Sequence, residues 1–241
     1  MEKGDDWLAR SRRLVGDAAL ERLAACRVAV FGLGGVGGHV VEVLARSGVG
    51  ALDLFDADVV SVTNLNRQLL ALRSTLGMKK VEVAAARVAD INPACRVTAH
   101  DLFFLPSNAD EVDFSVYDYV VDCVDTVAAK MELVRRCTRL GVPVICSMGA
   151  ANKLDATAFR VMDIADTRHD PLARIMRKRL KREGITHFKC VCSLELPREP
   201  EPGVGCDEES RRVPASNAFV PAAAGLVLAA EVVKELMSNE Q

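Results

Sequence analysis

The 241-residue sequence predicts an α/β protein built on a doubly wound, mainly parallel sheet. The first observation is an apolar strand at 27–31 that runs straight into a glycine-rich turn and then into a helix at 36–47. Second, short apolar strands continue to alternate with amphipathic helices as far as residue 147. Third, Tyr119-Val120-Val121 is a continuous apolar run, typical of a central strand that is covered on both faces.

The predicted elements follow one another in the order that such a sheet requires. A helix at 8–24 comes first, with Leu14, Ala18 and Leu23 apolar among arginines. The core then comprises strand 27–31, helix 36–47, strand 51–56, helix 79–91, strand 96–100, a short helix near 107–112, strand 117–122, helix 126–140 and strand 142–147. Helices between parallel strands form right-handed crossovers.

The last third of the chain has a different character, and we expect it to be appended to the same domain. A strand is predicted at 159–164 and a basic amphipathic helix at 171–183. Residues 197–215 are rich in proline and charge and are expected to form a mobile loop. The closing segment, 219–237, is predicted as an apolar helix with Pro221 in its first turn, packed back on the sheet. The single predicted domain therefore has an N-terminal helix at 1–24, a core at 25–150 and a C-terminal region at 151–241.

Composition and charge limit the location and the partners of the chain. Half of the residues are hydrophobic and 27% are charged, which is ordinary for a globular protein. The net charge of −2 gives no overall attraction to nucleic acid, so such binding needs a local basic patch. Acids occupy the N-terminus where a secretory signal needs an apolar core, and proline, glycine and charges interrupt 219–237. We therefore expect a cytoplasmic protein without a membrane span.

The eight cysteines contain no Cys-x-x-Cys pair and are expected to be reduced. Most lie in apolar surroundings, as small core residues do. Cys190, Cys192 and Cys206 form the one cluster whose spacing suggests a site. A zinc ion there would need a fourth ligand and unusual spacing, so we expect no structural zinc.

The glycine-rich turn predicts a nucleotide site and a Rossmann-like sheet. Gly32, Gly34 and Gly37 have the spacing of the dinucleotide fingerprint, in which backbone N–H groups approach a phosphate at the start of the next helix. Asp56 ends the following strand, about 20 positions after Gly37, where an acid binds a ribose hydroxyl. The fingerprint alone leaves NAD, FAD and ATP open.

Charged residues after this strand favour a triphosphate over a dinucleotide. Asp58 is followed by Asn-Leu-Asn-Arg-Gln at 64–68. The planar guanidinium group of Arg67 in this run can bind phosphate oxygens through two parallel hydrogen bonds. Lys80, at the start of the next helix, adds a point charge. An NAD-dependent dehydrogenase has no obvious use for these side chains.

Asp122 and Asp125 come at the carboxyl end of the strand at 117–122, where ligands of open α/β sheets bind, so they are candidates to hold magnesium on phosphate. Each charged residue has an ordinary alternative when taken singly: Arg67 as a surface ion-pair partner, Lys80 as a solvated side chain, and Asp58 or Asp125 as a cap. Their order behind the glycine turn favours a triphosphate site.

Taken together, these motifs resemble the ThiF/MoeB/HesA family of ubiquitin-activating-enzyme-like adenylating proteins. The resemblance covers essentially the whole chain and rests on Gly-Leu-Gly-Gly-Val-Gly at 32–37, Asp56-x-Asp58, the run at 64–68, Lys80-Val81-Glu82, Ile91-Asn92-Pro93 and Asp122-x-x-Asp125. Within the family, the segments 147–155, 170–173 and 219–225 are similar to one branch, the tRNA threonylcarbamoyladenosine dehydratases.

The resemblance implies which residues form the site. The nucleotide-binding residues would be Gly32, Gly34, Gly35, Gly37, Asp56, Asp58, Asn64, Arg67, Lys80 and Asp122, and the catalytic residues Arg10, Arg67, Lys80 and Asp125. Gly34 and Gly35 would line the phosphates, and Asp56 would hold the ribose. Asp125 would bind magnesium near the α-phosphate.

A homodimer is also implied, in which an arginine from the N-terminal helix of one subunit reaches the phosphates of the other. Arg10 fits that position best, although Arg12 and Arg13 compete for it. Some family members bind an alkali cation, so a monovalent cation is a further expected ligand.

The implied activity uses ATP to adenylate the threonyl carboxylate of the modified adenosine next to a tRNA anticodon, which then cyclises with loss of water. A basic stripe is a candidate surface for tRNA phosphates, although a solvated helix face explains it equally well; it comprises Arg174, Arg177, Lys178, Lys181 and Arg182.

Three other functions remain open at this point. The first is an adenylating activator of a ubiquitin-like sulfur-carrier protein; a cysteine desulfurase or sulfur-acceptor system is a separate partner that the sequence leaves open. Such activators usually hold zinc through two Cys-x-x-Cys pairs, which this chain lacks, and often use a cysteine in a crossover loop, a part that Cys190, Cys192 or Cys206 would have to play. The others are a non-catalytic nucleotide-binding scaffold and an NAD-dependent oxidoreductase.

Overall fold

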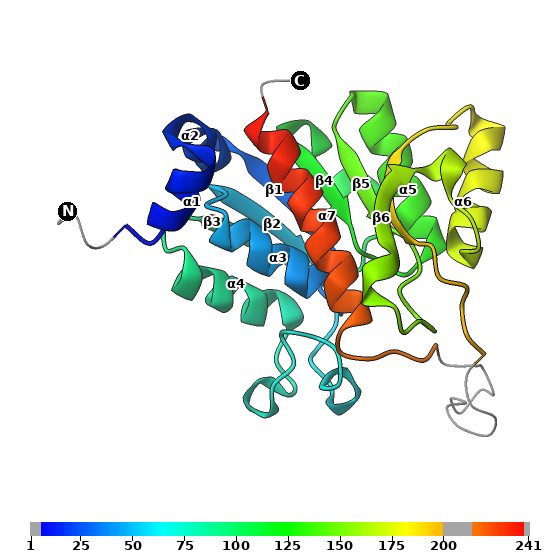
Figure 1. The fold of residues 1–241 in the computed structure, drawn as a ribbon, viewed down its shortest axis with the longest axis horizontal. Helices are drawn as coiled ribbons and strands as arrows, with labels where there is room; N and C mark the ends of the chain where they lie inside the picture. The colour runs from blue at the N-terminus through cyan, green and yellow to red at the C-terminus, as the bar shows by residue number, and fades with distance from the viewer. Residues whose placement is uncertain (1–5, 200–213, 239–241) are drawn as a thin grey trace.

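Residues 6–199 and 214–238 are described by the computed structural model, and they form a seven-stranded sheet with helices on both faces (Figure 1). The predicted fold class is confirmed. The strands are β1 (Arg27–Phe31), β2 (Ala51–Phe55), β3 (Arg96–His100), β4 (Tyr119–Asp122), β5 (Val144–Ser147), β6 (Phe159–Asp163) and β7 (Lys189–Ser193). Their order in the sheet is β3-β2-β1-β4-β5-β7-β6, and every neighbouring pair is parallel except β7 and β6.

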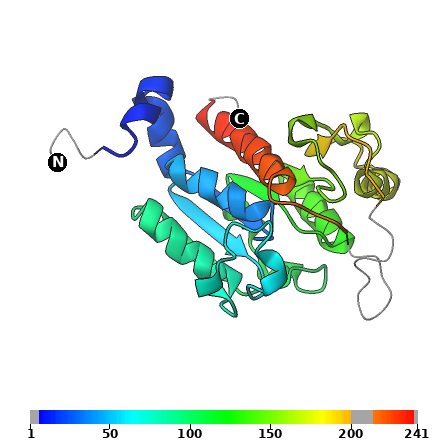
Figure 2. The same cartoon turned by 60° about the horizontal axis from the view of Figure 1, so that its bottom comes forward.

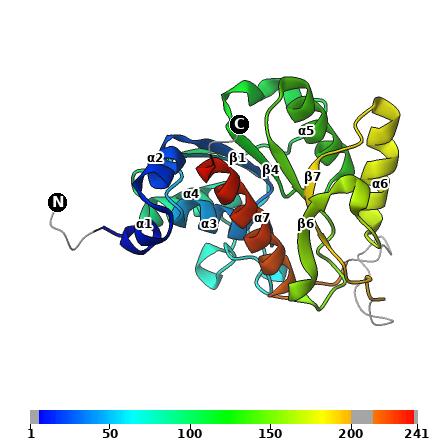
Figure 3. The same cartoon turned by 45° about the horizontal axis from the view of Figure 1, so that its top comes forward.

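Helices cover the two faces of this sheet in separate layers (Figures 1 and 3). The helices of the described chain are α1 (Ala9–Val15), α2 (Asp17–Ala25), α3 (Gly37–Arg46), α4 (Lys80–Ile91), α5 (Val127–Leu140), α6 (Pro171–Leu180) and α7 (Val220–Met237). α3, α4 and α7 pack on one face, and α5 and α6 pack on the other. Because side chains alternate along a strand, Val28 and Val30 of β1 join the first core while Ala29 and Phe31 join the second.

The closing helix α7 confirms the prediction for 219–237, with Pro221 in its first turn. It crosses the start of α3 closely, because a Cβ atom on Gly225 would lie only 2.5 Å from the carbonyl oxygen of Val36. Its Pro221 also lies against Gly35 of the glycine turn. The C-terminal helix therefore borders the predicted nucleotide site, at the edge of the molecule that Figure 2 brings forward.

Several details differ from the sequence prediction. The helix expected at 8–24 is broken into α1 and α2, because Gly16 takes the left-handed φ of +82° that ends the first of them. β7 is not predicted by the sequence pattern; it inserts between β5 and β6 and carries Cys190 and Cys192. The expected short helix near 107–112 is a single 3₁₀ turn, Ala109–Glu111, and the basic helix ends at Leu180 with one further 3₁₀ turn, Lys181–Glu183.

Most of the loop predicted at 197–215 lies outside the described residues, which omit 200–213. Within the described ranges, none of the helices is long and apolar enough to cross a membrane.

Candidate functional site

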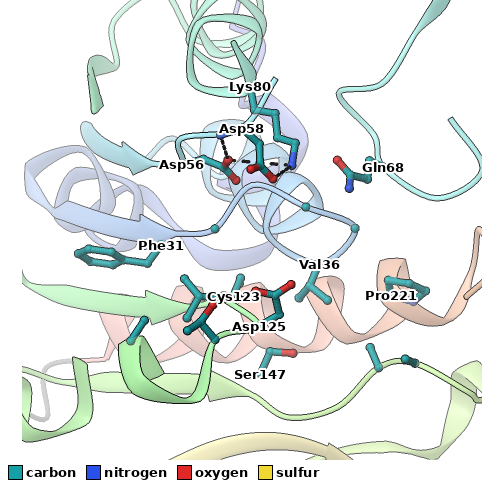
Figure 4. Close-up of a pocket in the computed structure, with 18 of the residues that line it drawn as sticks. Phe31, Val36, Asp56, Asp58, Gln68, Lys80, Cys123, Asp125, Ser147 and Pro221 are labelled. Carbon is teal, nitrogen blue, oxygen red and sulfur yellow. Dashed lines mark hydrogen bonds and ion pairs between the residues drawn. The ribbon is translucent and has the colours of Figure 1, made fainter. Parts of the chain in front are cut away.

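A cavity of about 640 Å³ opens at the carboxyl ends of β1, β2, β4 and β5, where ligands of open α/β sheets bind (Figure 4). It brings together most of the residues predicted from the sequence. Those that line it are Gly32, Gly34, Gly35, Asp56, Asp58, Asn64, Arg67, Lys80 and Asp125.

The glycine turn forms one wall of this cavity and needs its glycines for close packing. Gly32 has a φ of +86°, and its N–H donates to the carbonyl oxygen of Phe55 at 2.8 Å. A Cβ atom on Gly37 would lie 1.8 Å from the carbonyl oxygen of Gly32, so Gly37 lets α3 begin directly behind the turn without itself lining the cavity. Just before α3, the N–H groups of Gly34, Gly35 and Val36 have no acceptor among the described residues and belong to residues that line the cavity, an arrangement that favours a phosphate.

Asp56 is fixed at the end of β2 by two backbone groups. Its Oδ2 accepts a hydrogen bond from the N–H of Leu33 at 2.7 Å, and its Oδ1 accepts one from the N–H of Asp58 at 2.8 Å. Burial raises the pKa of the Asp56 carboxyl above its usual value, although these hydrogen bonds and Lys80 favour the charged form. The carboxylate is thus held in place as a hydrogen-bond acceptor for a hydroxyl group.

Lys80, the first residue of α4, places a cation on the same wall. Its side chain is almost buried, with the residue 4% exposed. Its Nζ donates to Oδ2 of Asp58 at 2.6 Å and lies 4.0 Å from Oδ1 of Asp56 (Figure 4). A charge that is held at the mouth of a partly desolvated cavity acts more strongly on a phosphate than it would in water.

The loop after β2 contributes Asn64 and Arg67. The side-chain oxygen of Asn64 accepts from the N–H of Ser61 at 3.1 Å, which fixes the 3₁₀ turn Val62–Asn64. Arg67 donates through Nη1 to the carbonyl oxygen of Thr63, at 2.9 Å. Its contacts within the described residues use Nη1 alone, so the Nε–Nη2 edge remains available for a bidentate contact with phosphate oxygens.

The two aspartates at the end of β4 have different positions, and the prediction that both face the cavity is wrong for Asp122. Asp125 is exposed and lines the cavity. Asp122 is 0% exposed and accepts a hydrogen bond from Nζ of Lys130 at 2.9 Å. Although burial opposes the charged lysine, Asp122 outweighs it and raises the pKa of Lys130. Asp122 therefore belongs to a sealed ion pair between β4 and α5.

Arg10 does not line the cavity of its own chain. It is exposed on α1, at the far side of the molecule from the C-terminal strands (Figure 1). A role for Arg10 at the phosphates therefore requires a second copy of the chain.

One end of the cavity is aromatic, and its residues are not among the site residues predicted from the sequence. Phe31 stacks on Phe55 with ring centroids 4.2 Å apart, and Phe104 meets Phe31 edge-on at 5.0 Å. All three line the cavity together with Leu102 and Phe103. The apolar run after the strand at 96–100 is the signal in the sequence that points to this end, which suits a planar base.

The wall opposite the glycine turn is formed by the segment Ser147–Ala151 after β5, with Pro214 and Ser216. A buried ion pair supports it: Nζ of Lys153 donates to Oδ2 of Asp170 at 3.2 Å and to the carbonyl oxygen of Gly149. Asp170 also caps α6 by accepting from the N–H of Ala173 at 2.8 Å. This wall is therefore held from behind by charged groups that are out of contact with solvent.

Asn152, with a left-handed φ of +60°, joins this wall to both flanks of residues 200–213. Its N–H donates to the carbonyl oxygen of Ala215 at 2.8 Å, and its side-chain oxygen accepts from the N–H of Ala215 at 2.8 Å. Its carbonyl oxygen accepts from the N–H of Arg198 at 2.8 Å. Three hydrogen bonds at one residue thus hold the two flanking segments together beside the cavity.

The two cysteines of β7 do not line the cavity. Cys190 and Cys192 are buried in that strand, and burial raises the pKa of Cys192 to about 11. Cys206 lies outside the described residues. Over 6–199 and 214–238, no group of three or more His, Cys, Asp or Glu side chains is placed to hold a metal ion.

Comparison with known proteins agrees with this geometry. The model of the ThiF family matches residues 8–241. The chain belongs to the ThiF family. A ThiF-family relative from Bacillus subtilis, named tRNA threonylcarbamoyladenosine dehydratase, is 42% identical over 240 residues, which cover 96% of this chain and 94% of that protein.

Solved structures of the Escherichia coli enzyme TcdA, named tRNA N6-threonylcarbamoyladenosine dehydratase, share the fold over nearly their full length. The complex with AMP has a TM-score of 0.87, and the complex with ATP has a TM-score of 0.84. Each is 37% identical to this chain and covers 98% of it and 97% of the solved chain. This ThiF-family chain therefore has the fold of an enzyme that has been solved with ATP and with AMP.

Proposed function

We propose that this chain is an ATP-dependent tRNA threonylcarbamoyladenosine dehydratase. Relatives with that name match it over nearly its whole length. The observation that carries the proposal is the cavity itself, which places Asp56, Lys80, Arg67 and Asp125 around one space behind a glycine turn. A triphosphate nucleotide needs these groups in this order: a hydroxyl acceptor, phosphate cations and a metal-binding carboxylate.

ATP would lie with its base at the aromatic end and its phosphates at the start of α3. Phe103, which is 53% exposed, and the partly buried Leu102 offer the apolar surface that a purine requires, and the buried rings of Phe31, Phe55 and Phe104 lie behind them. Asp56 would accept from the ribose hydroxyls, since backbone groups already fix its carboxylate. The triphosphate would then pass Lys80 and Arg67.

The reaction begins when an oxygen of the threonyl carboxylate attacks the α-phosphorus of ATP and pyrophosphate leaves. Arg67 and Lys80 stabilise the charge that develops on the phosphate oxygens and the leaving group, and each such contact is worth about 2–4 kcal/mol of the barrier. The carbamoyl group of the same side chain then attacks the activated carbonyl carbon, closes a ring and releases AMP. Because this attack is intramolecular, the reaction needs no covalent enzyme intermediate.

Asp125 fits the role of a magnesium ligand. Mg²⁺ commonly binds through one or two carboxylates together with substrate phosphates, so one exposed carboxylate at the cavity is sufficient. When bound, the metal would neutralise charge on the phosphate oxygens.

The active form would be a homodimer in which Arg10 of one subunit reaches the phosphates of the other. A mixing experiment tests this: equal amounts of the inactive Arg10→Ala and Arg67→Ala proteins are incubated until subunits exchange. If Arg10 acts across the dimer, each mixed dimer has one intact site, and about a quarter of the wild-type activity returns. If Arg10 acts within its own chain, the mixture stays inactive; if Arg10 has no role, the Arg10→Ala protein is itself active before mixing.

The function is tested by incubating the protein with ATP and tRNA that carries threonylcarbamoyladenosine, followed by mass spectrometry of the nucleosides. The nucleoside should lose the mass of one water, while AMP and pyrophosphate accumulate. Asp125→Ala and Arg67→Ala should abolish the reaction and leave the circular dichroism spectrum unchanged. No loss of water beside an active control enzyme would refute the proposal.

The alternative, activation of a ubiquitin-like sulfur-carrier protein, has a distinct signature: pyrophosphate exchange that depends on a carrier ending in Gly-Gly. The buried Cys190 and Cys192 offer it no accessible thiol. Three expectations remain part of the proposal: a monovalent cation near the site, a cysteine desulfurase or sulfur-acceptor partner, and a cytoplasmic location where tRNA and ATP are both present.

A further inference from the structure

The outward face of α6 and its following turn carries positive charge that no other described residue neutralises. Its five exposed cations make no side-chain hydrogen bond or ion pair with another residue of 6–199 or 214–238; they are Arg174, Lys178, Arg179, Lys181 and Arg182. Elsewhere on the surface, arginines such as Arg46 and Arg87 are paired with Glu42. In a chain with a net charge of −2, this face is a local basic surface.

Arg177, which the sequence pattern groups with these residues, is not part of the surface. Its guanidinium donates to the carbonyl oxygen of Thr167 at 2.8 Å and also contacts the Thr167 hydroxyl. Arg177 therefore fixes α6 to the segment before it. The cations that are available to a binding partner are the other five residues of this face.

Arg179 and Arg182 border a hollow of about 370 Å³ between α6 and α5. Pro106, Ala128 and Met131 form its apolar part. Glu183 also borders it, but both of its oxygens are held by Arg135, at 2.5 and 2.6 Å. The charge of Glu183 is thus already neutralised. Arg179 of α6 and Arg182 of the following 3₁₀ turn remain available to an anion.

This basic hollow is bordered by chain neighbours of residues that line the nucleotide cavity. Leu172 at the start of α6 and Ala129 at the start of α5 line the cavity, and Phe104, two residues before Pro106, lines it as well. From Leu172 to Arg182 the helical path extends about 15 Å. α5 and α6 lie side by side at this edge of the molecule (Figures 1 and 3). A ligand that occupied the cavity could therefore continue into the hollow.

We propose that the hollow and the outward face of α6 bind the phosphate backbone of the tRNA whose modified nucleotide occupies the cavity. This inference rests on the proposed function. An RNA strand that inserts one nucleotide into the cavity must lead its neighbouring phosphates over the rim, and the unpaired guanidinium groups of Arg179 and Arg182 lie on that path. Arginine suits this contact because its planar fork binds phosphate oxygens in pairs.

The test compares two double variants that remove the same charge. Arg179→Gln/Arg182→Gln alters the hollow. Arg96→Gln/Arg139→Gln is the matched control, because both residues are exposed, without a described ion-pair partner, and lie at the first residue of β3 and the last turn of α5, away from the cavity. Fluorescence anisotropy measures the affinity of each protein for labelled, modified tRNA at several salt concentrations.

The hollow variant should bind tRNA more than about tenfold more weakly than wild type in about 0.1 M salt, and the slope of log affinity against log salt should become shallower by about 1.4 for two lost phosphate contacts. ATP affinity and kcat at saturating tRNA should stay at the wild-type level, with the loss confined to KM for tRNA. The control variant should match the wild type.

Equal tRNA affinity and equal salt slope in the two double variants would overturn the proposal, and would leave an acidic protein surface as the partner that this face fits. Failure of the proposed function is recognised separately, because the wild type itself would then not remove water from the modified nucleoside. A wild type that does not bind modified tRNA at all would overturn both.

Discussion

An aspartate with a lysine nearby stands at the carboxyl edge of both β2 and β4, yet one of these pairs borders the cavity and the other is sealed in the interior. After β2, Asp56 and Asp58 line the cavity with Lys80. After β4, Asp122 and Lys130 are 0% and 1% exposed and contact each other at 2.9 Å. The same residue types therefore form a candidate site in one place and a structural ion pair in the other.

The position of the lysine in its helix makes the difference. Lys80 is the first residue of α4, so it stays at the carboxyl edge of the sheet where the cavity opens. Lys130 is the fourth residue of α5, and its side chain reaches the end of β4 beneath the helix. Asp125, two residues before α5, is then the residue that reaches the cavity. Both lysines are buried, so the two pairs differ in their carboxylates: the side chain of Asp58 is 65% exposed, and that of Asp122 is 0% exposed.

The largest effect should come from breaking the sealed pair. Lys130→Met leaves the carboxylate of Asp122 buried without a partner, so the free energy of unfolding should fall by about 3–5 kcal/mol in urea denaturation. The double variant Asp122→Asn/Lys130→Met removes both charges and should recover most of this loss. A single variant within about 1 kcal/mol of wild type would mean that Asp122 is not an isolated charge when Lys130 is removed.

The open pair should show the opposite pattern, with a loss of activity and little loss of stability. Lys80→Met should lower kcat/KM for the proposed dehydration by about 10²–10³-fold, as expected when one phosphate-stabilising group is lost. Lys79→Met is the matched control, since that neighbouring lysine is paired at the surface with Asp101 at 3.0 Å. Comparable losses from both variants would indicate a general electrostatic effect and would argue against a specific role for Lys80.

The contributions of the two aspartate–lysine pairs to stability should also depend on pH in different ranges. Because the pKa of Asp56 is raised by burial, its contribution to the free energy of unfolding is complete below its ordinary value of 3.8 and is lost as pH rises through the raised pKa. The pKa of Lys130 is raised from 10.5, so the contribution of the sealed pair persists until pH rises above that value. The measurement is urea unfolding without nucleotide, from about pH 4 upwards. The free energy of unfolding of wild type should fall relative to that of Asp56→Asn as pH rises through the acid range. A free energy of wild type that stays constant or rises relative to the variant would contradict this.

The smallest effect is expected at Cys123, which directly follows β4 and lines the cavity. Burial raises the pKa of its thiol well above the usual range, so it is not a nucleophile at neutral pH. Cys123→Ala should therefore keep the rate of dehydration within about twofold of wild type. A loss of an order of magnitude, with ATP affinity unchanged, would instead assign the thiol a chemical role.

The sequence predicts the β2 end of the site well because the necessary information is local. The glycine turn, Asp56 and Lys80 each sit at the junction between a strand and a helix, and such junctions are marked by glycine, by apolar periodicity and by the first charge after an apolar run. Once the sheet is parallel, its carboxyl edge brings these junctions together.

Features that depend on tertiary packing are not visible in the same way. β7 has cysteines at two of its five positions and gains its place from pairing with β5 and β6. The inward direction of Asp122 depends on which residue of α5 lies beneath it, and the aromatic end of the cavity depends on Phe31 and Phe104 meeting from distant segments. None of these contacts has a signature within a short window of sequence.

The hydrogen bonds of Asn152 have a consequence for how this protein tolerates change. Because the chain leaves near Arg198 and returns near Ala215 against the same asparagine, the separation of those two points does not depend on how many residues connect them. The entropy of closing a longer connection grows only with the logarithm of its length. Insertions and deletions between these anchor points should therefore leave this wall of the cavity unchanged.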